Sequence, residues 1–363
     1  MNEPLPPREL TEVAHLVDQR LTEVLTSERE KWATHDPRFD EAIEILQSVA
    51  QRGGKRLRAA FCYWSWYGSK GGTQDVDPRT DEAEFTQIIN VCTAVELLHT
   101  FALIHDDVMD DSSMRRGHPT VHKAQTKRLQ EMAWRGEPRR FGESVAVLVG
   151  NLGHVYSDQL LQDAPAPARK LWNNVKVELN LGQYLDIRSA AAGELDFATA
   201  RQVAWYKSAL YTIRRPMELG LAVSGASSDD LTSTIGRFSD PLGRAFQLRD
   251  DILGLFGDEV KLGKPIGDDI RDAKATELIA FARQKANPEQ SKLLDSMGSA
   301  TLTGADIAAI VEVIRATGAV GYVDHEIENL VVSAESVLGE LPYSPVAKRA
   351  LSSLAHYVAS RNL

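Results

Sequence analysis

Residues 94–122 read AVELLHTFALIHDDVMDDSSMRRGHPTVH, an apolar run that leads into a dense acidic cluster. The apolar part has helical length and contains no helix breaker, which predicts one buried helix. The cluster places four carboxylates within six residues: Asp106, Asp107, Asp110 and Asp111. At 3.6 residues per turn, Asp106 and Asp110 lie one turn apart on the same face. His99 precedes Asp106 by seven residues, two turns back on nearly that face.

Carboxylates this close repel each other, and an apolar helix cannot hold them cheaply unless a cation neutralises them. Ligands made only of oxygen suit Mg²⁺, which takes one or two carboxylates and completes its shell with water and phosphate. The alternative is a solvated acidic helix end. Arg115, Arg116 and Gly117 follow at once, and paired arginines beside paired carboxylates favour a metal-bridged polyphosphate clamp.

The composition is that of a soluble globular protein: 363 residues, 43% hydrophobic and 25% charged. A net charge of −10 argues against a nucleic-acid binder. Cys62 and Cys92 lie in apolar helical runs, so we expect reduced thiols and a cytoplasmic setting. We find no signal-peptide pattern at the N-terminus and no run of 18 apolar residues, so no transmembrane span is expected.

Helical periodicity recurs along most of the chain, and no segment shows sustained strand-like alternation. The fold class that we predict is therefore all-α, a single-domain helical bundle around a central cavity spanning residues 1–363. The Pro-rich residues 1–10 are expected to be flexible, and residues 68–80, 112–119, 127–143 and 257–272 to be loops. Helices are expected at 12–25, 39–50, from 55 onward, and at 81–111, 144–163, 167–191, 197–225, 229–256, 273–286, 304–317, 321–337 and 344–360.

A second acidic group lies within residues 246–272, FQLRDDILGLFGDEVKLGKPIGDDIRD. Asp250 and Asp251 close a helical face that also carries Phe246, Gln247 and Leu253. Such a pair alone indicates solvated surface. Together with the first cluster, it predicts metal ions held from opposite walls of one cavity.

Basic residues complete this pattern. Lys55 and Arg58 follow a glycine pair, whose exposed backbone N–H groups and adjoining helix start favour an anion. Lys207 lies in an otherwise apolar helix, where a lysine needs an anionic partner, either a ligand or a structural carboxylate. Lys264 and Lys274 flank Asp268 and Asp269 and are candidates to close over phosphate.

These motifs, in this order, resemble those of the trans-isoprenyl diphosphate synthases, the polyprenyl synthetase family with the isoprenoid synthase fold. GGKRLR resembles the family's GGKxxRP, and DDVMDDSSMRRG resembles DDxxD followed by RRG. FQLRDDILG resembles FQxxDDxxD, and LGQYLD and YKSALY resemble the GQxxD and KT segments. GKPIGDDIRDAK resembles the GKPxGxDxxxxK loop, so the resemblance spans most of the chain.

The resemblance implies a role for each matching residue. Three Mg²⁺ ions would be held, two by Asp106 and Asp110 and the third by Asp250. The allylic diphosphate would contact Arg115, Lys207 and Lys264, with Gln247 beside the reacting carbons and Ser208 where the family often has Thr. Isopentenyl diphosphate would be held by four residues, Lys55, Arg58, His99 and Arg116. The resemblance also implies a homodimer with the 81–111 helix near its interface.

Three positions depart from the family pattern. Gly254 replaces the last Asp of the second motif, Asn151 stands in GNLG where GD is usual, and Ala59 replaces Pro. None of these departures removes a charge that the predicted chemistry requires. The expected activity is head-to-tail condensation of isopentenyl diphosphate with dimethylallyl, geranyl or farnesyl diphosphate, by ionisation, attack and proton loss.

Product length is expected to depend on the depth of the apolar tunnel beneath the first Asp cluster. Phe101 lies five residues before Asp106 and Ala102 four before, with no insertion within DDxxD. A bulky residue followed by a small one resembles the geranylgeranyl (C20) type, with farnesyl (C15) as the second candidate. The alternative for Phe101 is a plain core position.

Three other functions compete with this assignment. A class I terpene cyclase also uses DDxxD and Mg²⁺, but it would have an Asn/Ser/Glu triad that residues 250–254 lack. A non-catalytic subunit would be expected to lose carboxylates that are all present in the first motif. A helical scaffold leaves the order of the motifs unexplained.

Overall fold

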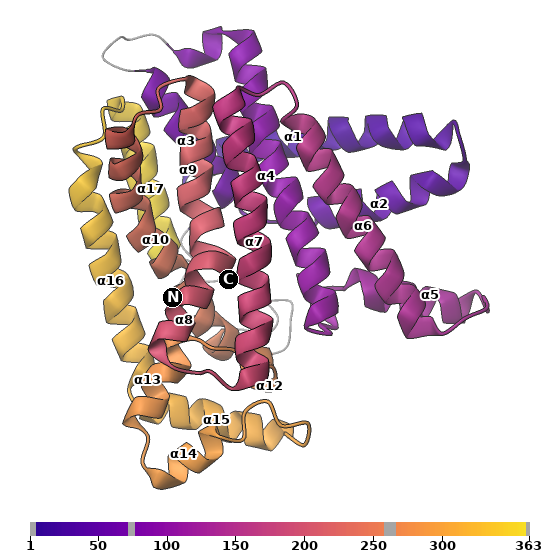
Figure 1. The fold of residues 1–363 in the computed structure, drawn as a ribbon, viewed down its shortest axis with the longest axis vertical. Coiled ribbons are helices and arrows are strands. Elements are labelled where there is room, and N and C mark those ends of the chain that lie inside the picture. The colour runs from indigo at the N-terminus through magenta and orange to yellow at the C-terminus, as the bar shows by residue number, and fades with distance from the viewer. Residues whose placement is uncertain (1–4, 72–76, 258–265, 361–363) are drawn as a thin grey trace.

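The computed structural model describes residues 5–71, 77–257 and 266–360, and these form a helical bundle (Figure 1). The long and short helices are α1 Arg8–Ala33, α2 Pro37–Gln51, α3 Leu57–Lys70, η1 Pro78–Thr80, α4 Glu82–Met109, α5 Val121–Glu131, α6 Pro138–Leu160, α7 Ala166–Ala192, α8 Phe197–Ala204, η2 Trp205–Arg214, α9 Arg215–Ser224, α10 Asp229–Phe256, α12 Asp268–Arg271, α13 Glu277–Lys285, α14 Pro288–Leu294, α15 Gly304–Ala316, α16 Ala319–Leu338 and α17 Pro345–Ser360. The prediction of an all-α fold is confirmed.

Helix α4 is the central element of the bundle. It packs against α1, α3, α6 and α9, and the middle of the helix, from Ile88 to Leu98, is almost entirely buried. Buried apolar side chains around its whole circumference explain why its sequence shows a continuous apolar run rather than a single stripe. It is also the one helix among the described residues that is long and apolar enough to cross a membrane, but 67% of that window is buried inside the fold.

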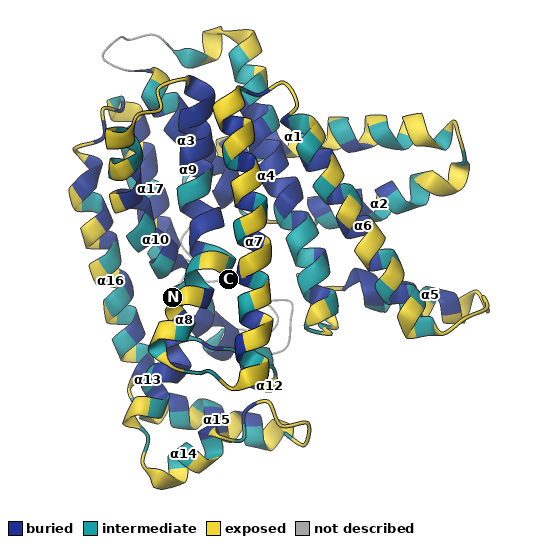
Figure 2. Ribbon diagram, viewed as in Figure 1, coloured by how far each residue is buried: buried dark blue, intermediate teal, exposed yellow. Residues whose placement is uncertain are grey.

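One connected hydrophobic core extends through the bundle, from Leu10 of α1 to Val358 of α17. Figure 2 shows this buried interior, with exposed residues along the outer face of α7 and at the projecting end of the α1–α2 hairpin. Helices α13, α14 and α15 gather at one end of the bundle (Figure 1). The functional side chains described below lie on the inner faces of α4, α7, η2 and α10.

The helix predicted over 197–225 is interrupted by a π-helical segment, η2. π-helical turns carry one extra residue per turn and occur frequently at functional sites. Gly182 of α7 permits the close approach of this segment, because a Cβ there would lie 2.5 Å from the carbonyl carbon of Tyr206 and 2.6 Å from the amide nitrogen of Lys207. The two backbones are therefore in direct contact beside Lys207.

Other boundaries differ from the prediction. The loop predicted at 127–143 is wrong at both ends, because α5 extends to Glu131 and α6 begins at Pro138. α14 was not predicted, and residues 114–115 and 118–119 form a two-residue antiparallel ladder, β1 (Met114–Arg115) with β2 (His118–Pro119). Of the segment expected to be flexible, residues 8–10 are helical and Leu10 is buried.

Candidate active site

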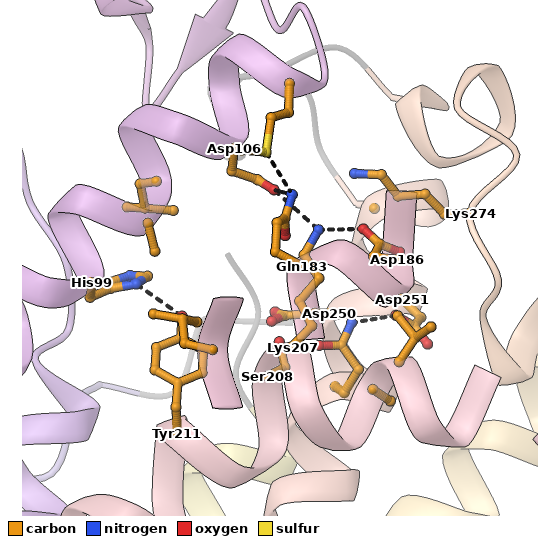
Figure 3. Close-up of a pocket in the computed structure, with 18 of the residues that line it drawn as sticks. His99, Asp106, Gln183, Asp186, Lys207, Ser208, Tyr211, Asp250, Asp251 and Lys274 are labelled. Carbon is orange, nitrogen blue, oxygen red and sulfur yellow. Dashed lines mark hydrogen bonds and ion pairs between the residues drawn. The ribbon is translucent and has the colours of Figure 1, made fainter. Parts of the chain in front are cut away.

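A cavity of about 290 Å³ opens between α4, α7, η2, α10 and the segment before α13. Figure 3 shows carboxylates and cationic groups entering it from opposite walls. Ten of the residues predicted from the sequence line it: Arg58, His99, Phe101, Ala102, Asp106, Arg115, Lys207, Ser208, Gln247 and Asp250. Both acidic clusters therefore face one cavity, as the sequence predicts.

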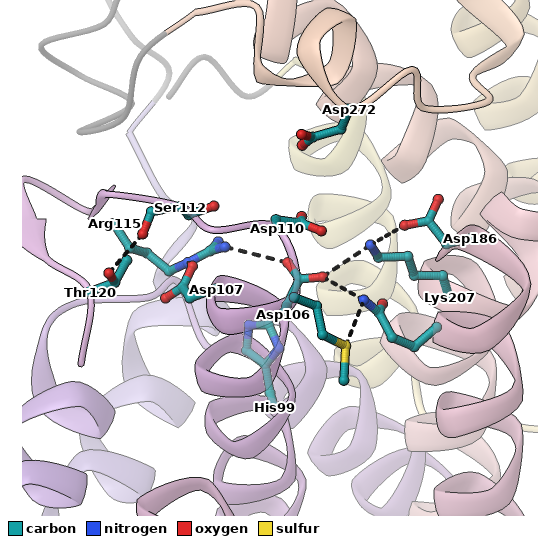
Figure 4. Close-up of polar contacts among 12 residues, drawn as sticks. His99, Asp106, Asp107, Asp110, Ser112, Arg115, Thr120, Asp186, Lys207 and Asp272 are labelled. Carbon is teal, nitrogen blue, oxygen red and sulfur yellow. Dashed lines mark hydrogen bonds and ion pairs between the residues drawn. The ribbon is translucent and has the colours of Figure 1, made fainter. Parts of the chain in front are cut away.

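Asp106 is the most highly connected carboxylate of the first cluster (Figure 4). One oxygen accepts hydrogen bonds from Lys207 Nζ at 3.1 Å and Gln183 Nε2 at 3.0 Å, and the other lies 3.4 Å from Arg115. Burial opposes ionisation of Asp106, but the cations around it, Lys207 first, outweigh that effect and hold its pKa well below the usual range. Asp106 is consequently ionised and directed into the cavity.

Asp110 and Asp107 take different positions, although both belong to the same cluster. Asp110 follows the last residue of α4, does not line the cavity and accepts a hydrogen bond from Lys274 Nζ at 2.6 Å. Burial and the charge of Asp106 raise the pKa of Asp110. Asp107 accepts from Arg115 Nε at 2.6 Å, and burial raises its pKa to about 6 in spite of that arginine. Asp107 therefore orients Arg115.

Lys207 lies between two carboxylates from different helices. Its Nζ donates to Asp106 of α4 and, at 2.5 Å, to Asp186 of α7. Burial opposes the positive charge, but Asp106 and Asp186 outweigh it and raise the pKa of Lys207. The two alternatives for Lys207, a partner for a structural carboxylate or for a ligand, are thus compatible. The same ammonium group pairs with Asp186 and lines the cavity.

The second acidic wall contains three carboxylates. Asp250 lines the cavity, while Asp251 is buried, accepts a hydrogen bond from Gln247 Nε2 at 2.7 Å and has a pKa raised far above its usual value by burial. Asp269 also lines this wall. A Cβ at Gly254 would stand 2.7 Å from Asp269 Oδ2, so the carboxylate of Asp269 occupies the space that Gly254 leaves open.

A cationic corner lies on the other side of the cavity. Arg58 donates to the hydroxyl of Tyr211 at 2.7 Å and stands 4.4 Å over its ring, and that hydroxyl is 3.0 Å from Nδ1 of His99. Burial, followed by the nearby arginines, lowers the pKa of His99 far below its usual value, so His99 is neutral at pH 7. It acts there as a hydrogen-bonding group rather than as a cation.

Two of the predicted substrate-binding residues that the structure describes, Arg116 and Lys55, do not line the cavity. Arg116 donates to the carbonyl oxygen of Gly53 at 2.5 Å. Lys55 lies 5.0 Å above the ring of Tyr357 on the last helix. Lys264 lies outside the described residues.

The apolar end of the cavity contains Phe101 and Ala102. The Phe101 ring lies 4.5 Å from the ring of His105 and 5.2 Å from that of His154 on α6. Phe101 therefore forms part of the wall while packing against its neighbours.

The sequence analysis assigned no role to Gln183, Asp186, Tyr211 and Asp269, and it gave Lys274 as a loop charge that is a candidate to close over phosphate. The first two lie in the LGQYLD segment, which carried part of the resemblance, so a signal for them was present. Tyr211 ends the YKSALY segment and Asp269 lies in GKPIGDDIRDAK, so the same signal was present for both. Their contacts depend on the π-helical segment and on the space at Gly254.

Comparison with known proteins assigns this arrangement to a family. The family model described as polyprenyl synthetase matches residues 40–314. The chain belongs to the polyprenyl synthetase family. A crystal structure of geranylgeranyl pyrophosphate synthase from Corynebacterium glutamicum, complexed with isoprenyl diphosphate and magnesium, superposes with a TM-score of 0.89 at 33% identity, covering 97% of this chain and 99% of that one.

Curated relatives agree with this membership. The geranylgeranyl diphosphate synthase of Saccharolobus solfataricus is 30% identical over 74% of this chain and 78% of its own length. The geranylfarnesyl diphosphate synthase of Aeropyrum pernix is 28% identical over 86% of this chain and 92% of its own. The prediction of a trans-isoprenyl diphosphate synthase, a transferase, is confirmed.

The remaining departures from the polyprenyl synthetase pattern lie outside the cavity. Asn151 is exposed on α6, and Ala59 is buried near the start of α3. Neither residue lines the cavity.

Proposed function

We propose that this synthase condenses isopentenyl diphosphate with an allylic diphosphate and that its main product is geranylgeranyl diphosphate (C20). The observation that supports catalysis most directly is that Asp106 and Asp250 line one cavity together with Lys207. Phe101 supports the C20 assignment because its side chain lines the apolar end of the cavity. Its ring also contacts the ring of His105, which lies four residues further along the same helix. Farnesyl diphosphate (C15) is the second candidate.

We assign the allylic diphosphate to the wall that carries Asp106, Lys207 and Arg115, and we add Lys274, which lines the cavity on the opposite side. Isopentenyl diphosphate is assigned to the corner of Arg58, with Lys55, His99 and Arg116 around it. Ser208 and Gln247 then lie between the two seats. Lys264 keeps the role implied by the family resemblance.

The carboxylates fit magnesium, with Asp106 and Asp110 as ligands on one wall and Asp250 on the other. Among the residues that the structure describes, no three His, Cys, Asp or Glu side chains form a complete metal site. Mg²⁺ usually takes few carboxylates and completes its shell with phosphate oxygens, so we expect three ions that bind together with the diphosphate. When bound, magnesium neutralises the diphosphate leaving group.

The chain's own side chains perform the other tasks. Lys207, Arg115 and Lys274 stabilise charge on the departing diphosphate through ammonium and guanidinium N–H groups. The allylic C–O bond breaks to give a carbocation and diphosphate, and the double bond of isopentenyl diphosphate attacks the cation. A proton is then lost to the released diphosphate. Apolar walls such as Phe101 and Ala102 exclude the water that would quench the cation.

The test is incubation of the purified chain with isopentenyl diphosphate and, in turn, dimethylallyl, geranyl and farnesyl diphosphate. Chromatography and mass spectrometry should show C20 as the main product. A hydrocarbon product would support a cyclase instead, and the absence of turnover by the chain alone would support a non-catalytic subunit.

Phe101→Ser provides the test of chain length. Removing the ring deepens the apolar end of the cavity, so the product distribution should shift beyond C20. Val108→Ala on the same helix, which does not line the cavity, is the control and should leave the distribution unchanged. An unchanged length in Phe101→Ser would remove this residue as the tunnel floor.

We also propose a homodimer in the cytoplasm. Both α6 and α7 carry exposed apolar side chains, which a second copy would cover: Val147, Leu148, Val155, Val177, Leu181 and Tyr184. Cys62 and Cys92 are buried free thiols, which suits a reducing compartment. Light scattering should give twice the 40.1 kDa chain mass. The double variant Leu148→Asp with Leu181→Asp should have the mass of a single chain.

A further inference from the structure

The loop of residues 52–56, which precedes α3, has an unusual backbone. Gly53, Gly54 and Arg56 all have positive φ angles, of 74°, 122° and 51°. For a residue with a side chain, the left-handed conformation costs about 1–2 kcal/mol, so Arg56 needs compensating contacts. Its neighbours in sequence, Lys55 and Arg58, are the cations assigned above to isopentenyl diphosphate.

Arg56 is turned into the protein and is only 4% exposed. Its Nε donates to Asp18 Oδ1 at 2.8 Å, its Nη2 donates to the carbonyl oxygen of Ala50 at 2.6 Å, and its Nη1 lies 3.3 Å from Glu96 Oε2. These contacts join the loop to α1, α2 and α4. The guanidinium group is thus directed away from the cavity, which it does not line.

Glu96 is the buried carboxylate of this corner, with 2% exposure. Its second oxygen accepts a hydrogen bond from the backbone N–H of Ala59 at 3.3 Å. Glu96 therefore occupies an amide in the first turn of α3, one of those that a helix start would otherwise offer to an anion. The start of α3 therefore has one amide fewer to offer to an anion than its sequence indicates.

Two guanidinium groups flank Gly54: a Cβ there would stand 3.2 Å from Arg116 Nη1 and 3.4 Å from Arg56 Nη1. Cations this close repel each other unless a carboxylate intervenes. Because Glu96 pairs with Arg56, Arg116 can remain beside the loop, where it donates to Gly53 O. Glu96 thereby neutralises Arg56, which has a structural role, while Arg116 keeps its positive charge beside the loop.

We infer that Glu96 is a positioning residue for isopentenyl diphosphate: by holding Arg56 and the start of α3, it fixes the loop that presents Lys55 and Arg58. This inference rests on the proposed function, because it concerns the seat that the proposal assigns to that substrate. Glu96 itself touches neither substrate. Its effect should therefore appear in the binding of one substrate and not of the other.

The test is Glu96→Gln, which keeps the shape and an acceptor for Ala59 N–H but removes the charge. Calorimetry without an allylic primer should show isopentenyl diphosphate binding about tenfold more weakly than in wild type. The KM for the allylic diphosphate should stay within about twofold. Asp18→Asn, at the half-exposed partner of Arg56, should give a smaller change in the same direction and serves if Glu96→Gln does not fold.

The matched control is Glu218→Gln. Glu218 is also buried, pairs with Arg214 at 2.9 Å and with Arg215, and lies outside the cavity lining. Glu218→Gln should lower the melting temperature without weakening the binding of isopentenyl diphosphate. Unchanged binding in folded Glu96→Gln and Asp18→Asn, equal losses for both substrates, the same loss in Glu218→Gln, or no binding to wild type would each overturn the inference. Binding to wild type without elongation would instead contradict the proposed function.

Discussion

At the scale of single residues, Gly254 and Asp269 show how a missing side chain changes the packing of the second acidic wall. Gly254 stands where the family pattern has an Asp, and the carboxylate of Asp269 occupies the space beside it. Asp269 itself matches the Asp of the GKPxGxDxxxxK pattern and lies in α12, so the second acidic wall has two carboxylates from α10 and one from α12.

If Asp269 serves this wall, Asp269→Asn should reduce kcat about 10–100-fold and raise the Mg²⁺ concentration needed for half-maximal rate, as loss of outer-shell partners of a metal commonly does. Steady-state kinetics with a magnesium titration measures both. Asp268→Asn is the matched control, because Asp268 pairs with Arg271 and does not line the cavity. Equal effects of the two variants would contradict the assignment.

Asp240 allows a pH prediction that is independent of the metal site. Burial raises its pKa to about 6, although Arg214 Nη1 donates to it at 2.9 Å. Because its pKa is about 3.9 in the unfolded chain, the fold binds the proton more tightly, and stability is lost as the pH rises through about 6. Relative to wild type, Asp240→Asn should gain melting temperature between about pH 4 and pH 7. A difference that stays constant with pH would show that Asp240 titrates normally.

At the scale of elements, Gly182 controls the distance between α7 and η2. The Cβ of Gly182→Ala would meet the backbone of residues 206–207, which cannot give way as a flexible side chain can. We expect a loss of about 1–3 kcal/mol in stability and a larger relative loss of kcat, since Lys207 would move with its backbone. Chemical denaturation and steady-state kinetics test the two parts.

Gly321→Ala in α16 is the control for this substitution. A Cβ there meets nothing within 4 Å and the glycine has no positive φ, so this variant should gain about 0.4–1 kcal/mol through reduced freedom of the unfolded chain. If Gly182→Ala were equally harmless, the close approach of α7 and η2 would not be needed to place Lys207.

The sequence predicted those elements whose burial leaves a pattern. α4 was predicted because its apolar run is unbroken, whereas α5, VHKAQTKRLQE, is largely polar and α14 has only seven residues. The π-helical turn of η2 leaves no periodic mark in the sequence, since its extra residue depends on packing against α7. The predicted helix boundaries near Glu131 and Pro138 were wrong because the polar sequence around these residues resembles a loop.

The same limit applies to the site. Asp106 and Asp250 could be predicted because two acidic clusters on apolar helices occur together with the basic motifs, in the order of the polyprenyl synthetase pattern. The hydrogen bond from Gln183 and the ion pair of Asp186 could not be derived from spacing. The first depends on how α7 lies against the end of α4, and the second on how closely α7 approaches η2. The contacts of Tyr211 with Arg58 and His99 could not be predicted either, because these three residues lie on three different helices.

At the scale of the whole molecule, the candidate active site joins elements that are distant in sequence. Lys207 links η2 to α4 and α7, and Lys274 links the segment before α13 to the end of α4. Asp106 and Asp110 repel each other at the end of α4, and Asp250 lines the same cavity as Asp106 from α10. A ligand that neutralises both walls at once should therefore stabilise the entire bundle rather than one helix.

Magnesium with inorganic diphosphate tests this coupling without requiring turnover. A ligand at 100 times its dissociation constant stabilises the folded state by about 2.7 kcal/mol, so the two together should raise the melting temperature by several degrees, and a chelator should reverse the shift. Asp106→Asn should abolish the shift and reduce kcat by at least about 100-fold. Asp111→Asn is the control in the same acidic run, because Asp111 pairs with Lys123 at 2.7 Å and does not line the cavity. A full shift in Asp106→Asn, or undiminished turnover with chelator, would mean that the two acidic walls do not share a metal-bound diphosphate.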